Sequence, residues 1–106
     1  MIVPVQLPGC APQWGFMAGV QVRFTGRVQG VGFRSYVQRR ALKLGVRGTV
    51  WNCLDGSVMA RMFHEERATL DLLVSFLQTG PVDVRSAEVL EVDDEPVESF
   101  TIGATR

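Results

Sequence analysis

The sequence of 106 residues is poor in side chains that bind metals or form disulfides. It has two cysteines, Cys10 and Cys53, and one histidine, His64, which form neither a CxxC pair nor a zinc set. Two scattered cysteines suit a reducing compartment, so we expect a cytoplasmic protein. No apolar run approaches the length of a membrane span, and residues 1–16 lack the basic start of a leader peptide. We therefore expect no membrane association.

Acidic residues are absent from the first half of the chain, and the first side-chain carboxylate along the sequence is that of Asp55. Seven basic residues lie between Gln21 and Gly48: Arg23, Arg27, Arg34, Arg39, Arg40, Lys43 and Arg47. The segment from Asp83 to Glu98 is mainly acidic, and the formal net charge is zero, so there is no overall attraction to nucleic acid or membrane. Most of these side chains are expected on solvated faces, but a positive field remains around residues 26–34.

The length suits one compact domain, and 46% hydrophobic residues can supply its core. Residues 1–18 break any regular pattern with prolines and glycines, which predicts a flexible N-terminal tail before a folded unit at residues 19–106. Val20, Val22 and Phe24 alternate as in a strand. A helix is expected over 33–44, ended by Gly45, because its apolar residues recur at helical spacing. Further along we expect strands at 46–52, 57–63, 84–92 and 99–104, a hairpin turn at 54–56, and a second helix opened by Glu65 and Glu66 and closed by Gly80-Pro81.

The element order is therefore β-α-β-β-α-β with a short fifth strand. It predicts the α+β class and a ferredoxin-like sandwich, with two helices on one face of a mainly antiparallel sheet. In this fold the first two strands run parallel with the third between them, about 10 Å apart. The loop that starts at Gly26 and the strand-ending Asn52 should then face one small region.

Residues 26–34 read GRVQGVGFR, which is neither a Walker A loop nor the dinucleotide fingerprint. No Ser, Thr, Asp or Asn stands at residues 30–33 to cap the following helix, so its first backbone donors lack a partner. Glycines let such a backbone fold into a concave nest, and phosphate binds naturally at a helix start. The loop is a candidate anion site as well as a candidate tight turn.

Arg34 and Asn52 are the side chains that could complete such a site. A cation in the first helical turn interacts unfavourably with the helix dipole, by about 0.3–1 kcal/mol. An anion bound between the cation and the helix start would make the interaction favourable. Alternatively Arg34 points to solvent, and the loop alone leaves both interpretations evenly matched. Asn52 is common at turn entries, but beside the loop its amide could hold a water molecule.

GRVQGVGFR followed by Val50-Trp51-Asn52 and by Asp55-Gly56 resembles the acylphosphatase family over about residues 19–104. The resemblance implies the ferredoxin-like fold and hydrolysis of carboxyl–phosphate anhydrides to a carboxylate and phosphate, without metal or cofactor. It also implies that Arg34 binds the phosphoryl group and that Asn52 orients the attacking water. Phosphate-binding backbone amides are implied at Arg27, Val28, Gln29, Gly30, Val31 and Gly32. Cys53 stands where the family often has Thr.

The sequence is also compatible with functions other than acyl phosphate hydrolysis. A non-catalytic module that binds acyl phosphate or carbamoyl phosphate is one alternative, because the same fold unit occurs fused in hydrogenase-maturation proteins. An RNA-binding module is less favoured, since residues 57–63 lack the aromatic RNP1 pattern. We expect Trp14 and Trp51 to be tail or packing residues and not platforms on which bases stack. Cys53 lacks the Cys-x5-Arg spacing of cysteine phosphatases, and His64 is expected at the start of the second helix. We expect a monomer acting on a small molecule, not on nucleic acid.

Overall fold

The computed structural model describes residues 18–80, 82–93 and 97–106. The predicted tail lies outside this range except for Ala18, which already belongs to the first strand. The elements in chain order are β1 (Ala18–Gly26), α1 (Phe33–Lys43), β2 (Arg47–Asn52), β3 (Val58–His64), α2 (Arg67–Gln78), β4 (Val84–Glu91) and β5 (Phe100–Ile102). The predicted order of elements is confirmed, with boundaries that differ by one or two residues.

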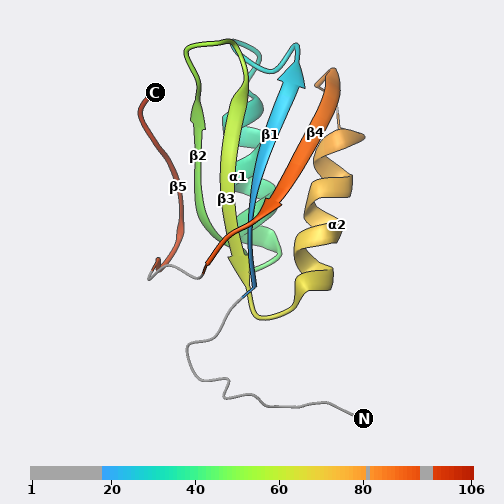
Figure 1. The fold of residues 1–106 in the computed structure, drawn as a ribbon, viewed down its shortest axis with the longest axis vertical. Helices are drawn as coiled ribbons and strands as arrows, with labels where there is room; N and C mark the ends of the chain where they lie inside the picture. Colours follow the sequence, from blue (N-terminus) through green and yellow to red (C-terminus); the bar gives the residue numbers. More distant parts are fainter. Residues whose placement is uncertain (1–17, 81, 94–96) are drawn as a thin grey trace.

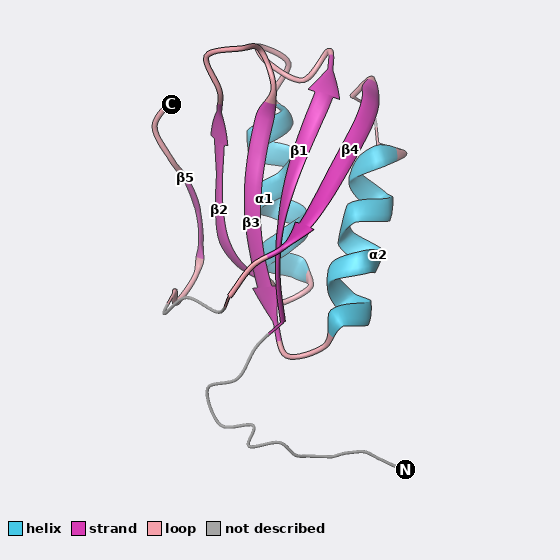
Figure 2. Cartoon of the chain, in the orientation of Figure 1, coloured by secondary structure: helices cyan, strands magenta, loops and turns pink. Residues whose placement is uncertain are grey.

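The strands form one sheet in the order β4-β1-β3-β2-β5. β1 pairs antiparallel with β3 and β4, and β2 pairs antiparallel with β3, whereas β2 and β5 are parallel. Both helices pack on the same face of the sheet (Figures 1 and 2). This is the predicted ferredoxin-like α+β sandwich. Because β1 and β2 both run antiparallel to β3, which lies between them, their C-terminal ends lie at the same end of the sheet. We call this end, where both strands finish, the edge that carries the loop.

The core between the sheet and the helices follows from the spacing of apolar residues. Alternate residues of β1 and every third or fourth residue of each helix are buried there: Val20, Val22, Phe24, Phe33, Val37, Ala41, Leu70, Leu73 and Leu77. The rings of Phe24 and Phe33 meet edge to face, with centroids 5.1 Å apart. Since Phe33 is the first residue of α1, this contact anchors the start of the helix directly after the glycine loop.

The start of α2 differs from the prediction. His64 ends β3 instead of opening the helix, and its Nδ1 accepts a hydrogen bond from the Glu66 N–H at 2.9 Å. This contact accompanies an extended backbone at Glu66 (φ −109°, ψ 118°), so the helix begins only at Arg67. Glu65 and Glu66 therefore precede the first turn rather than forming it. No helix in the described part of the chain is long and apolar enough to cross a membrane.

Candidate active site

The loop between β1 and α1 takes a backbone path that requires glycine. Gly30 has φ 75° and Gly32 has φ 79°, both in the left-handed region. An L-residue pays roughly 1–2 kcal/mol to adopt this conformation. A Cβ added at either position would meet no atom within 4 Å, so both glycines border open space. The left-handed turn at Gly32, the N-cap residue, sends the chain from the loop into α1.

Backbone donors of this loop are left without partners. The first hydrogen bond of α1 runs from the Tyr36 N–H to the Gly32 carbonyl at 3.0 Å, and no side chain caps the helix. Within the part of the chain that the structure describes, the N–H groups of residues 28–33 donate no hydrogen bond. The Arg27 N–H differs, because it donates to the Asp83 carbonyl at 2.9 Å. The anticipated set of open donors therefore begins at Val28.

Four of these residues, Val28, Gly30, Gly32 and Phe33, line a cavity of about 120 Å³. Its lining consists of Val28, Gly30, Gly32, Phe33, Arg34, Ser35 and Ile102. Arg34 is half-buried in the first turn of α1, and no described residue pairs with its guanidinium. No acidic residue lines the cavity, so the local field is positive. Backbone donors and one guanidinium are the groups that bind phosphate oxygens well.

Asn52 ends β2 at the same edge of the sheet as this loop. Its Oδ1 atom is buried and, among the residues that the structure describes, is the one buried side-chain nitrogen or oxygen without a hydrogen-bond partner. A buried acceptor without a partner costs about 1–3 kcal/mol, which makes it a strong candidate to receive an O–H from a bound water molecule. The water-holding role predicted for Asn52 requires such an open acceptor.

The turn between β2 and β3 is held by Asp55. Its Oδ1 accepts hydrogen bonds from the Ser57 hydroxyl at 2.6 Å and the Ser57 N–H at 3.0 Å, and its Oδ2 pairs with Arg23 of β1. The hydrogen bonds from Ser57, and then the Arg23 charge, lower the pKa of Asp55 below its ordinary value. The turn that follows Asn52 is therefore an ordered structure that is fixed to β1.

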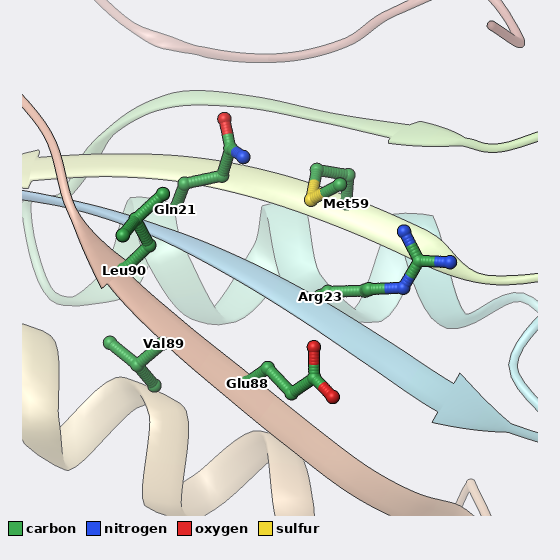
Figure 3. Close-up of a pocket in the computed structure, with 6 residues that line it drawn as sticks. All are labelled: Gln21, Arg23, Met59, Glu88, Val89 and Leu90. Atoms are coloured by element: carbon green, nitrogen blue, oxygen red, sulfur yellow. The ribbon is translucent and has the colours of Figure 1, made fainter.

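A larger groove of about 410 Å³ crosses β4, β1 and β3 on the face away from the helices (Figure 3). Its lining residues are Gln21, Arg23, Met59, Glu88, Val89 and Leu90. It suits an anion less well, because Arg23 already pairs with Asp55 and the carboxylate of Glu88 lies in the same groove. Among the described residues, no group of three or more His, Cys, Asp or Glu side chains could share a metal ion.

Sequence reasoning missed two contributions from the C-terminal segment. Ile102 lines the loop cavity, because the parallel pairing of β5 with β2 brings it there. Arg106 flanks Asn52: its N–H donates to the Asn52 carbonyl at 2.9 Å, and its own carbonyl accepts from the Leu54 N–H at 3.0 Å. The Arg106 guanidinium lies 4.0 Å over the ring of the buried Trp51. No local pattern in the sequence indicates these contacts.

Chemically, the two features offer different groups. The open loop amides and the Arg34 guanidinium can donate to an anion, whereas the open Oδ1 of Asn52, which is not among the residues that line the cavity, can accept from a water molecule. The set contains no carboxylate, thiol or imidazole beside the cavity, so it can bind and position reactants rather than transfer protons. This division fits hydrolysis of a substrate that has a good leaving group.

The chain is similar to known proteins in sequence and in fold. The family model described as acylphosphatase matches residues 20–102. An acylphosphatase from Archaeoglobus fulgidus is 40% identical over 88 residues, which cover 81% of this chain and 98% of the relative. The crystal structure of acylphosphatase from Bacillus subtilis has 31% identity and a TM-score of 0.76, covering 81% of this chain and 98% of the other.

A structure of full-length HypF, in a phosphate- and nucleotide-bound form, also matches. It has 26% identity and a TM-score of 0.77, but the match covers 92% of this chain and only 13% of HypF. The family model and the relatives matched along nearly their whole length carry the assignment. On this evidence of sequence and fold, the chain belongs to the acylphosphatase family.

Proposed function

We propose that this acylphosphatase cleaves the carboxyl–phosphate bond of a small acyl phosphate, with the loop after β1 holding the phosphoryl group. The amides of Val28, Gln29, Gly30, Val31 and Gly32 form the cradle, and Arg34 binds the same oxygens. The proposal rests mainly on one observation: the backbone donors and the guanidinium at this cavity have no hydrogen-bond partner among the described residues. Arg27, whose N–H is committed to Asp83, contributes only its side-chain charge.

In the proposed reaction, Asn52 orients the attacking water. The water donates one O–H to the Asn52 Oδ1 and directs a lone pair at phosphorus. As the new P–O bond forms, the bond from phosphorus to the acyl oxygen breaks and the carboxylate leaves. A phosphate oxygen of the substrate takes one proton of the water, and the other stays on the attacking oxygen as part of the new P–O–H group. Because a carboxylate is a good leaving group, the protein needs only to position water and stabilise charge on the equatorial oxygens, without metal or cofactor.

We further infer a cytoplasmic monomer that acts on a small molecule and not on nucleic acid. Cys53 carries a free thiol, which suits a reducing compartment. Trp51 is buried beneath Arg106, so its ring offers no open platform for a base. Folding of residues 19–106 as a unit, with the preceding residues as a tail, is tested by limited proteolysis: protection of the tail equal to that of the core would contradict it.

Steady-state hydrolysis of benzoyl phosphate, with inorganic phosphate as competitive inhibitor, tests the activity directly. We expect turnover without added metal and competitive inhibition by phosphate. Phosphate binding with no hydrolysis of benzoyl, acetyl, carbamoyl or aspartyl phosphate would instead favour the non-catalytic binding module. The rates across these four compounds also reveal which acyl group the enzyme prefers.

A further inference from the structure

The side chain of Gln29 joins the two halves of the active site. Its Nε2 donates hydrogen bonds to the Cys53 carbonyl and to the Ser57 carbonyl, both at 2.7 Å. A side-chain amide has two N–H donors, so this pair of contacts uses both. Gln29 lies in the middle of the cradle, whereas its two acceptors lie at the base of the β2–β3 turn, beginning at the residue after Asn52.

No other side chain connects the cradle to the rest of the described structure by a hydrogen bond. Residues 27–32 are otherwise tied down by the Arg27 N–H and by the buried side chain of Val28. With two glycines in the left-handed region, this loop has little local restraint of its own. The Gln29 amide therefore supplies the direct link between the cradle and the strand end that carries Asn52.

The acceptor side of this link is rigid. The Cys53 N–H donates to the Ser57 carbonyl at 2.9 Å, and the Gly56 N–H donates to the Cys53 carbonyl at 3.1 Å. Asp55 closes the turn through its two hydrogen bonds from Ser57. A cradle attached to this turn is thus held at a fixed distance from Asn52.

We propose that Gln29 is a positioning residue that sets the distance between the bound phosphoryl group and the water on Asn52. The proposal rests on the proposed function, because it assigns these two binding roles to the two halves of the site. Attack on phosphorus needs the water in line with the leaving oxygen, and a displacement of about 1 Å can cost about a hundredfold in rate. Loss of the link should therefore lower kcat more than it weakens phosphate binding.

The first test is Gln29→Met, which keeps the length of the side chain and removes both donors. We expect kcat on benzoyl phosphate to fall about 10–100-fold, with a much smaller change in the inhibition constant for phosphate. The matched control is Gln38→Met. Gln38 also donates from Nε2 to a backbone carbonyl, that of Phe100 at 2.9 Å, but it lies within α1 and outside the cavity lining. This control should lose stability without losing kcat.

The second test, Gln29→Glu, uses pH and keeps the proposal falsifiable if Gln29→Met folds poorly. A carboxylate facing the two carbonyls of Cys53 and Ser57 is repelled, whereas the protonated acid regains one donor. Two acceptors beside the acid raise its pKa above the ordinary value of about 4.3. The kcat of Gln29→Glu, divided by that of the wild type at the same pH, should rise as the pH falls from about 8 to about 5.

The outcomes separate this proposal from the activity on which it rests. Wild-type turnover with an unchanged kcat in Gln29→Met, or a pH-independent ratio in Gln29→Glu, overturns the positioning role and leaves the proposed function intact. An equal loss of kcat in Gln29→Met and Gln38→Met would mark the effect as general destabilisation and also overturn it. An inactive wild type overturns both proposals together.

Discussion

Two arginines stand in the first turns of the two helices, and their surroundings are opposite. Arg67 opens α2 and pairs with two carboxylates, Glu91 at 2.6 Å and Asp71 at 3.2 Å. The hydrogen bond to Glu91, and then the one to Asp71, raises the pKa of Arg67 above its ordinary value. Arg34 is the second residue of α1, where the first turn holds no carboxylate and the guanidinium has no partner in the described ranges.

The difference shows how a cation is accommodated at the positive end of a helix. Such a charge is unfavourable by about 0.3–1 kcal/mol unless an anion lies close by. At α2 the protein supplies the anions itself, so the arginine serves the structure. At α1 the guanidinium and the neighbouring amides have no partner in the described structure, as expected if the proposed phosphoryl site lies there.

The largest expected effect is that of Arg34→Ala. Removal of the guanidinium should lower kcat on benzoyl phosphate at least about a thousandfold and weaken inhibition by phosphate. Stability should stay the same or rise, by up to roughly 1 kcal/mol, since an unpaired cation leaves the helix start. Kinetics and urea unfolding measure the two effects. A variant that loses stability while keeping its turnover would place Arg34 in the same structural role as Arg67.

Asn52→Ala should have the next largest effect, on the other half of the site. We expect kcat to fall about a hundredfold, because the water is no longer directed at phosphorus. The inhibition constant for phosphate should stay nearly unchanged, since the cradle remains. Rates and phosphate inhibition are read in one assay. Turnover at the wild-type rate would contradict the role assigned to the open Oδ1 acceptor.

Gly32→Ala tests the backbone of the open helix start. The variant should lose roughly 1–2 kcal/mol of stability from the left-handed conformation, and phosphate should bind more weakly as the cradle shifts. Gly45→Ala is the matched control, because Gly45 has a similar φ of 72° at the opposite end of α1. If both variants bind phosphate equally well, the path of the loop does not matter for the anion.

Arg67→Ala should have the smallest effect. Its ion pairs lie at the surface, where each contributes little, so we expect a slight decrease in the melting temperature and an unchanged kcat. Thermal unfolding and the benzoyl phosphate assay are sufficient measurements. A marked fall in kcat would mean that Arg67 also acts on the site. It would contradict the distinction between a structural arginine in α2 and a phosphate-binding arginine in α1.

The sequence predicted those parts of the molecule that depend on local pattern. The spacing of Phe33, Val37 and Ala41 located α1, and the lack of Ser, Thr, Asp or Asn around Gly32 correctly predicted a helix start without a side-chain cap. The element order was enough to bring Asn52 to the edge that carries the loop.

Contacts that depend on tertiary register could not be predicted in this way. The bonds of Gln29 to the β2–β3 turn join residues 24 and 28 positions apart, with no spacing rule to indicate them. The Arg27 N–H donates to the carbonyl of Asp83, the residue just before β4, which lies there because β4 pairs with the distant strand β1. The predicted start of α2 was wrong by two residues: the Glu66 backbone is extended and its N–H donates to the His64 Nδ1, a side-chain contact that no spacing rule indicates.

The parallel pairing of β5 with β2 has a practical consequence for handling the enzyme. The chain enters the fold at Ala18, at the end of the sheet far from the loop, whereas Arg106 lies against Asn52 (Figure 1). Affinity tags, fusion partners or attachment to a solid support should therefore be placed before Ala18. A tag joined after Arg106 would start beside Asn52 and the proposed active site, so we expect it to lower turnover.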